Sequence, residues 1–141
     1  MSKRFWLGLA AYIIPTFALG FLWHLVVFAP YYDALQIYRA DLIFPFGLLA
    51  MLIQGSILSW LFPRIMVGAE GSWLWQGLKF GLLAGLFAWG YSTAAVAAKH
   101  VMTSVPLFLG LETGFTALHY AIVGPLIALA HRRVILADPK N

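Results

Sequence analysis

The chain has 141 residues, of which 62% are hydrophobic and only 10% are charged. Soluble domains have roughly 45–50% and 25% of these classes, so this composition excludes a water-soluble fold and indicates a membrane protein. The sequence contains no cysteine, which excludes disulfides, thiolate metal sites and cysteine nucleophiles. The net charge of +4 comes from basic residues that flank apolar runs, a pattern typical of membrane topology rather than of nucleic-acid binding.

Four apolar runs are each long enough to cross a bilayer. They cover Phe5–Phe28, Leu42–Phe62, Trp75–Ala97 and Pro106–Ala130. A membrane-spanning helix needs about 20 residues, so the sequence predicts an all-α fold, a four-helix transmembrane bundle that forms one domain over residues 1–141. The first run is longer than a signal-peptide core and Pro15 interrupts it, so we expect it to be a retained span.

The segment between the first two runs is polar but patterned. Tyr31, Leu35, Tyr38 and Leu42 recur at helical spacing. This spacing predicts a short interfacial helix over residues 31–41, with its aromatic face in the membrane and a place at the rim of a binding site. The alternative is that the segment is the frayed end of the first span.

The basic residues are divided unequally between the two predicted sides of the membrane. One side has seven, Lys3, Arg4, Arg64, Lys79, Arg132, Arg133 and Lys140, and the other has only Arg39 and Lys99. Because cytoplasmic loops carry the excess of Lys and Arg, the asymmetry predicts that both termini lie in the cytoplasm. We expect the chain to span a bacterial inner membrane.

Small residues form a stripe on each of the last two runs. The third run has Gly81, Gly85, Ala88, Ser92 and Ala95, and the fourth has Gly110, Gly114, Ala117, Ala121, Gly124 and Ala128. Such stripes let helix backbones approach closely inside a membrane. The sequence therefore predicts that the third and fourth helices form the tightest contact, although a stripe could equally face another subunit.

A second face of the last run is polar. Glu112, Thr116, His119 and Val123 follow the same steps, and Glu112 lies about 200° around the helix from Gly110. Ionisable residues are costly inside a bilayer and usually mark a functional site or a helix partner. We expect this face to contact the first two helices or another subunit.

Depth in the membrane suggests partners for these groups. With a rise of about 1.5 Å per residue, Glu112 lies roughly 9 Å inside the outer boundary, at the level of His24 and Tyr91. His119 lies deeper, near Gln54. The sequence therefore predicts an outer cluster of His24, Tyr91 and Glu112, and an inner pair of Gln54 and His119.

Three interpretations of these polar groups remain open: hydrogen bonds that fix helix register, a proton or ion path, and a metal or haem site. Glu112 and His119 are about 10.5 Å apart along the helix axis, too far to ligate one ion easily. A haem held by His24 and His119 would need both at one depth. We therefore predict no metal, no cofactor and no catalytic residue.

The first span carries a recognisable pattern. Phe17-x-x-Gly20-x-x-Trp23-His24 is followed by Phe28 and Pro30-Tyr31, and the last run contains Gly114-x-x-x-x-His119-Tyr120 and Gly124. These motifs resemble those of a family of small, uncharacterised four-helix bacterial membrane proteins. The resemblance covers the whole chain and implies a four-helix fold, with attention to Trp23, His24 and His119. It implies no activity.

Together these patterns favour a non-catalytic helical subunit or interaction module of a membrane assembly. Its expected partners are the bilayer and either itself or other membrane subunits, with no nucleic acid. The alternative is a small homo-oligomeric, proton-coupled transporter or channel that uses Glu112 and His119. Binding of a metal or haem is a lesser alternative.

Overall fold

The computed structural model describes residues 2–66, 69 and 71–135, and throughout this part the chain forms helices and their connections, with no strand. The predicted all-α fold is confirmed, and so are four helical stretches long and apolar enough to cross a membrane. They are Lys3–Val27, Phe44–Ile65, Trp73–Lys99 and Val105–Arg132.

Each stretch is built from one or more helices. The elements are α1 (Lys3–Leu22), the π-helix η1 (Trp23–Val27), α2 (Ala29–Leu35), α3 (Phe44–Ile65), α4 (Trp73–Trp89), the π-helix η2 (Gly90–Ala94), α5 (Ala95–Lys99) and α6 (Val105–Ile135). The hydroxyl oxygens of Ser2 and Ser72 accept hydrogen bonds from the amides of Phe5 and Trp75, which caps the starts of α1 and α4.

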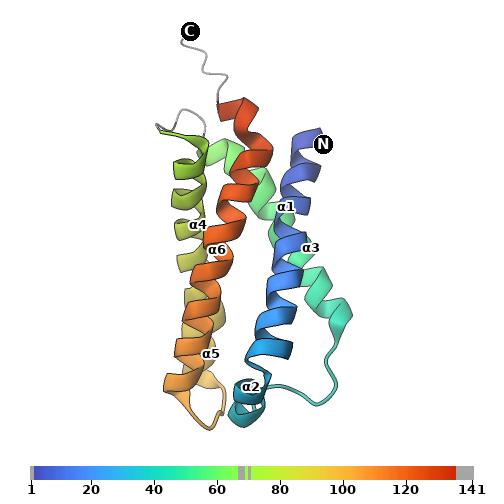
Figure 1. Cartoon of the computed structure of the whole chain (residues 1–141), viewed down its shortest axis with the longest axis vertical. Coiled ribbons are helices and arrows are strands. Elements are labelled where there is room, and N and C mark those ends of the chain that lie inside the picture. Colours follow the sequence, from blue (N-terminus) through green and yellow to red (C-terminus); the bar gives the residue numbers. More distant parts are fainter. Residues whose placement is uncertain (1, 67–68, 70, 136–141) are drawn as a thin grey trace.

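The helices are arranged as an open bundle (Figure 1). α1 packs on α3 and on α6, and α6 packs on α4, whereas α3 and α4 hardly touch. The start of α1 and the end of α6 lie at one end of the bundle, here called the terminal end, and α2 lies at the other, the α2 end.

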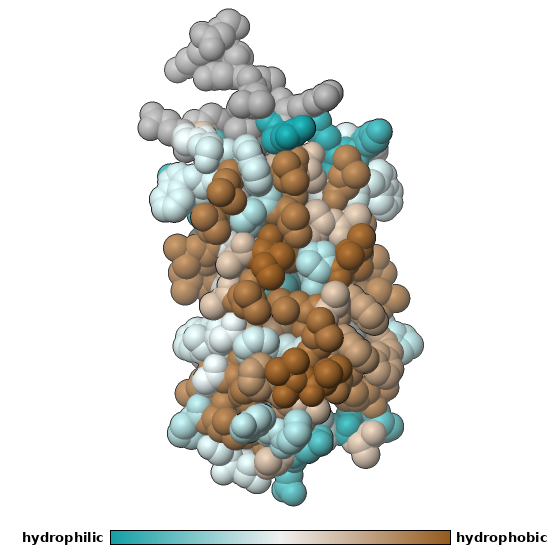
Figure 2. All heavy atoms as spheres, viewed as in Figure 1, coloured by the Kyte–Doolittle hydropathy of each residue, from teal (hydrophilic) through white to brown (hydrophobic). Residues whose placement is uncertain are grey.

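The surface is apolar over the middle of the bundle. Figure 2 shows hydrophobic residues along most of its length and hydrophilic ones gathered near its two ends. The exposed fractions of Phe46 and Phe87 are 68% and 82%, as expected of side chains that face lipid. At the terminal end, the Arg64 guanidinium lies 3.9 Å from the centre of the Trp60 ring. The predicted basic residue Lys140 lies outside the described residues.

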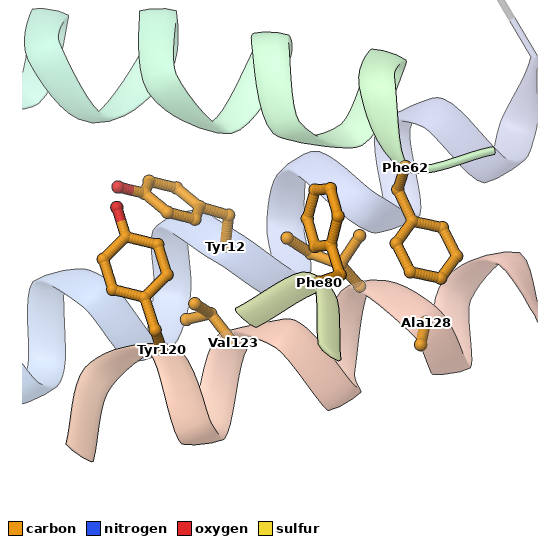
Figure 3. Packing of buried hydrophobic residues seen from close by; sticks show 7 residues of the cluster. Tyr12, Phe62, Phe80, Tyr120, Val123 and Ala128 are labelled. Carbon is orange, nitrogen blue, oxygen red and sulfur yellow. The ribbon is translucent and has the colours of Figure 1, made fainter. Parts of the chain in front are cut away.

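The core brings all four spans together towards the terminal end (Figure 3). Its buried members are Tyr12, Phe62, Phe80, Tyr120, Val123, Ile127 and Ala128. The rings of Phe62 on α3 and Phe80 on α4 meet edge to face, with centroids 5.0 Å apart. α3 and α4 therefore meet at this core, although they hardly touch elsewhere.

The α4–α6 contact is the most extensive in the bundle, as the small-residue stripes predict. A Cβ atom added at Gly81 would lie 2.3 Å from the carbonyl oxygen of Tyr120, and one at Gly124 would lie 2.3 Å from that of Gly77. Real Cβ atoms do not approach this closely, so the two backbones touch only because these positions are glycine.

Parts of the predicted stripes lie elsewhere. Gly114 faces the Trp23 ring of η1, at 3.4 Å for an added Cβ, and Gly110 meets nothing within 4 Å. Ser92 is exposed and lies within η2, where the π-helical turn departs from the α-helical spacing on which the predicted stripe depends. The stripe prediction is thus right for the middle of both helices and wrong for these three residues.

Between α4 and α6 the small residues also leave space. Ala117 and Ala121 line a second cavity of about 500 Å³ together with Gly81 and Gly85. The α1–α3 contact uses small residues that the sequence patterns did not single out. The Ser59 hydroxyl donates to the Phe5 carbonyl at 2.8 Å, directly beside Gly8.

The interfacial helix α2 is shorter than predicted. It ends at Leu35 because Gln36 adopts a left-handed conformation with φ 57°. Tyr31 is exposed, as a side chain on the predicted membrane face would be, whereas Leu35 of that face is buried together with Tyr32 against Phe108. Thr103 connects α2 to the segment before α6. Its hydroxyl donates a hydrogen bond to the Ala34 carbonyl at 2.7 Å, and its amide donates one to the Leu35 carbonyl at 3.3 Å.

Candidate functional site

A cavity of about 870 Å³ runs along the opening between α3 and α4 and is here called the groove. Its lining comes from all four spans and is mostly apolar. The six polar residues singled out from the sequence all line it: His24, Gln54, Tyr91, Glu112, Thr116 and His119. Its volume falls within the roughly 300–1,000 Å³ of small-molecule sites.

The groove exists because α3 packs on α1 and leaves α4 once past the Phe62–Phe80 contact. Only 11% of the most apolar stretch of α3 is buried, against 39% for α6. Gly20 and Gly47 widen the groove further, because an added Cβ would meet nothing within 4 Å at either. Phe87 and Tyr91 line it and are themselves highly exposed, so the groove opens to the side of the bundle.

A polar cluster lies near the α2 end of the groove, centred on Glu112. The Tyr32 hydroxyl donates to Glu112 Oε1 at 2.7 Å, and His24 Nε2 lies 3.3 Å from the same oxygen. The predicted contact between Glu112 and His24 is confirmed. Among the described residues, no hydrogen bond reaches the second carboxyl oxygen, Oε2.

The hydrogen bonds of His24 set conditions on where its protons lie. His24 Nδ1 lies 3.0 Å from the Gly20 carbonyl oxygen, which can only accept, so this bond requires a proton on Nδ1. A hydrogen bond between His24 Nε2 and Glu112 Oε1 then requires one further proton, on either atom. A His24–Glu112 pair that makes both bonds has no net charge in either arrangement.

Tyr32 takes the place that depth alone assigned to Tyr91. Tyr91 is 78% exposed at the edge of the groove, so the predicted cluster of His24, Tyr91 and Glu112 is wrong in this member. Tyr32 reaches Glu112 because α2 folds back beneath the bundle. Burial raises the pKa of the Tyr32 phenol most, and the hydrogen bond to Glu112 raises it further. In the sequence, the one feature that could have indicated this role is that Tyr32 is a polar residue on the predicted interfacial helix.

Aromatic rings surround the cluster. The His24 and Phe115 rings meet edge to face with centroids 4.4 Å apart, and the Tyr32 and Tyr38 rings stack at 5.2 Å and 5°. Tyr38, Phe115 and His24 line the groove next to Glu112. Burial and the nearby Glu112 charge raise the pKa of Tyr38, so both phenols stay neutral at physiological pH.

A second polar group lies deeper. The Thr16 hydroxyl donates to the Tyr12 carbonyl at 2.5 Å and therefore accepts from His119 Nε2, which lies 2.7 Å away. The Tyr12 hydroxyl donates to Gln54 Oε1 at 2.6 Å. Figure 3 shows the hydroxyl ends of Tyr12 and Tyr120 pointing to the same place.

The predicted pair of Gln54 and His119 is therefore wrong: each bonds α1 instead, because α1 lies between α3 and α6. The predicted orientation of the polar face of α6 is confirmed. Thr116, His119 and Val123 have exposed fractions of 8%, 4% and 0%.

Among the residues that the structure describes, no three of His, Asp or Glu gather in a way that could hold a metal ion. The Phe115 ring stacks on His119, with centroids 5.4 Å apart, and also contacts His24. It occupies the space that a haem between these two histidines would need.

No family model matches the chain, and neither a curated protein nor a solved structure matches it. The resemblance of its motifs to the uncharacterised four-helix family therefore stays a prediction.

Proposed function

We propose that this chain is a non-catalytic, multi-pass membrane protein that binds an amphiphilic molecule of the bilayer in the groove. The groove itself supports this proposal: a space of about 870 Å³ with apolar walls from four spans and two polar groups within it. An apolar chain can lie along α3 and α4, and a polar head can reach the cluster around Glu112. Entry is sideways, from lipid.

The proposal includes an orientation. Both termini lie in the cytoplasm of a bacterial inner membrane, because the basic residues favour the terminal end. The cluster of His24, Tyr32 and Glu112, at the α2 end, then lies towards the outer leaflet. A bound molecule would have its head there and its chain directed towards the bilayer centre.

Photolabelling tests the proposal. The purified protein in phosphatidylcholine nanodiscs is irradiated with a hexadecyl probe that carries a diazirine, and the labelled residues are mapped by mass spectrometry. We expect labelling to concentrate on residues that line the groove, such as Met51 and Ala84, above the labelling of lipid-facing residues such as Ile14. Equal labelling of both classes would overturn the proposal.

Glycine substitutions provide matched controls. Gly20→Leu and Gly47→Leu fill the groove without a clash, because nothing lies within 4 Å of an added Cβ. Gly90→Leu and Gly110→Leu add the same side chain at equally open positions outside the groove. The first pair should lower groove labelling severalfold, and the second pair should leave it unchanged.

Assembly is a second candidate function, favoured by the large unburied surface of α3. In that case a helix of a second copy or of another membrane subunit fills the groove and excludes the probe. Mass measurement of the nanodisc-embedded protein distinguishes the two. A monomer with probe bound supports the first proposal, and a stable oligomer without labelling of the groove supports the second.

A further inference from the structure

We propose that the head group held in the groove is a monovalent organic cation, such as an alkylammonium, and that its binding releases the proton shared by His24 and Glu112. This inference rests on the proposed binding function and names the chemical class of the molecule bound. It follows from the charges of the lining, the free carboxyl oxygen, the aromatic walls and the proton count of the pair.

The charges of the groove favour a cation. Among the described residues of its lining, Glu112 is the one acidic side chain, and there is neither lysine nor arginine. A carboxylate or phosphate head placed here would meet the Glu112 carboxyl group with no lysine or arginine among the described lining residues to pair with. A positively charged head would meet its counter-ion in a medium where an unpaired charge is costly.

Glu112 has room for this head. Its Oε1 atom is occupied by the Tyr32 hydroxyl and His24, but no described residue bonds Oε2. Because Glu112 lines the groove, Oε2 is the atom left for a bound molecule. A bound ammonium head could pair with the Glu112 carboxylate through this atom.

The walls also suit a cation. Phe115 and Tyr38 line the groove beside Glu112, and Tyr91 lines it on the opposite helix. Aromatic faces attract lysine-like and quaternary ammonium ions, so these rings suit a cationic head. Long apolar walls along α3 and α4 select cations that carry an alkyl chain.

Proton exchange follows from electroneutrality. Without a ligand, the His24–Glu112 pair holds one proton beyond that on Nδ1 and has no net charge. When a cation pairs with the Glu112 carboxylate, that proton leaves to water, and His24 remains neutral through its Nδ1–H bond to Gly20. Site charge is then zero again, so one cation replaces one proton.

Four other titratable side chains lie next to the pair or line the groove near it. Tyr32 from α2 and Tyr38 from the following connection stay protonated between pH 6 and 8, since the pKa of each is raised. Tyr91 lines the groove from η2. His119, deeper on α6, is hydrogen-bonded to Thr16. The exchange is the elementary step that a proton-coupled transporter would need.

Competition against the diazirine probe tests the inference. The competitors are dodecyltrimethylammonium and dodecanol, which share an alkyl chain but differ in charge, at pH 6, 7 and 8 in phosphatidylcholine nanodiscs. We expect the cation to compete up to about tenfold more strongly for each pH unit gained, and dodecanol to compete equally at each pH. Dodecyltrimethylammonium has a permanent charge, so titration of the competitor itself does not enter the comparison.

Substitutions assign the effect to Glu112. Glu112→Gln should weaken competition by the cation about thirtyfold or more and abolish its pH dependence, with dodecanol unchanged. Asp33→Asn makes the same chemical change on an exposed carboxylate of α2 and should leave both unchanged. The pH series on the unmodified protein needs no variant, so it decides the question even if Glu112→Gln does not fold.

The outcomes separate this inference from the proposed function. If the probe labels the groove but the cation competes no better at pH 8 than at pH 6, the inference is wrong and amphiphile binding stands. Competition by the cation that survives Glu112→Gln also overturns the inference. If the probe does not label the groove at all, the proposed function itself fails.

Discussion

At the scale of single residues, Glu112 shows how a carboxyl group is held within a membrane span. One of its oxygens has two partners, from α2 and from η1, and neither partner lies on its own helix. The cost of placing an ionisable group there is offset by bonds between elements, so these bonds also position α2 beneath the bundle.

Tyr32→Phe should destabilise the protein, because it removes the hydroxyl that donates to Glu112 and keeps the buried ring. A hydrogen bond to a charged group contributes about 1.5–3 kcal/mol. Thermal unfolding in detergent measures the change. Tyr31→Phe, the same substitution at the exposed neighbour, is the control, and equal midpoints for the two variants would contradict the role of Tyr32.

Alkaline pH should destabilise the folded state through the same residue. The pKa of Tyr32 is raised in the folded protein, so its contribution to stability is complete below about pH 10, the value for an unfolded chain, and is lost as pH rises towards the folded value. Between pH 9.5 and 11, the unfolding midpoint should fall less steeply in Tyr32→Phe than in the unmodified protein. Parallel slopes would show that Tyr32 ionises normally.

The sequence predicted the partner of Glu112 only in part. Depth along a helix can be counted from the sequence, and it placed His24 correctly beside Glu112. Counting cannot tell which way a side chain turns once the helix changes pitch, and Tyr91 on η2 lies exposed at the edge of the groove, away from Glu112. Nor could it show that α2 stops at Gln36 and folds back to bring Tyr32 inwards.

At the scale of elements, the α4–α6 contact depends on direct packing of one helix backbone on the other. Gly81→Leu should destabilise the protein by about 1–3 kcal/mol or more, because the new side chain would clash with the carbonyl group of Tyr120. Gly90→Leu, on the same stretch at an open position, should be within about 0.5 kcal/mol of the unmodified protein. Thermal stability in detergent compares them.

Two outcomes would change this account of the contact. Equal tolerance of both substitutions would mean that α4 and α6 can separate at little cost. If Gly81→Leu instead dissociates an oligomer of folded chains, the glycine face meets another subunit. Gly114→Leu should be milder than Gly81→Leu, because Gly114 faces a Trp23 ring at ordinary contact distance.

The elements themselves were readable because each span is a long apolar run, and the period of small residues marked the α4–α6 contact. The α1–α3 contact had no such stripe. It rests on one glycine from each helix, Gly8 on α1 and Gly55 on α3, together with the Ser59 hydroxyl, so neither helix carries a repeat at this contact. The groove was not predictable, since an absent contact between α3 and α4 leaves no mark on either helix.

At the scale of the whole molecule, the two ends of the bundle differ in charge. Lys3, Arg4 and Arg64 lie at the terminal end. Lys99, at the end of α5, and Arg39, which pairs with Asp41, lie at the other. The difference is the basis for the proposed orientation.

Cysteine labelling tests the orientation directly, because the chain has no native cysteine. A cysteine at Ser2 should react with a membrane-impermeant maleimide only after the cells are opened, and one at exposed Ala40 should react in intact cells with a permeable outer membrane. The reversed pattern would invert the bundle and place Glu112 near the cytoplasm.

The order of the helices around the bundle has a consequence for biosynthesis. α3 and α4 follow one another in the chain but hardly touch, and α4 finds its main neighbour in α6, the last helix to be made. A nascent chain that has inserted α1, α3 and α4 therefore has α4 without its glycine-lined partner, and His24 without Glu112. The bundle can therefore complete its main contact only when its C-terminal helix has been made, and a ribosome stalled before α6 would leave the chain half assembled.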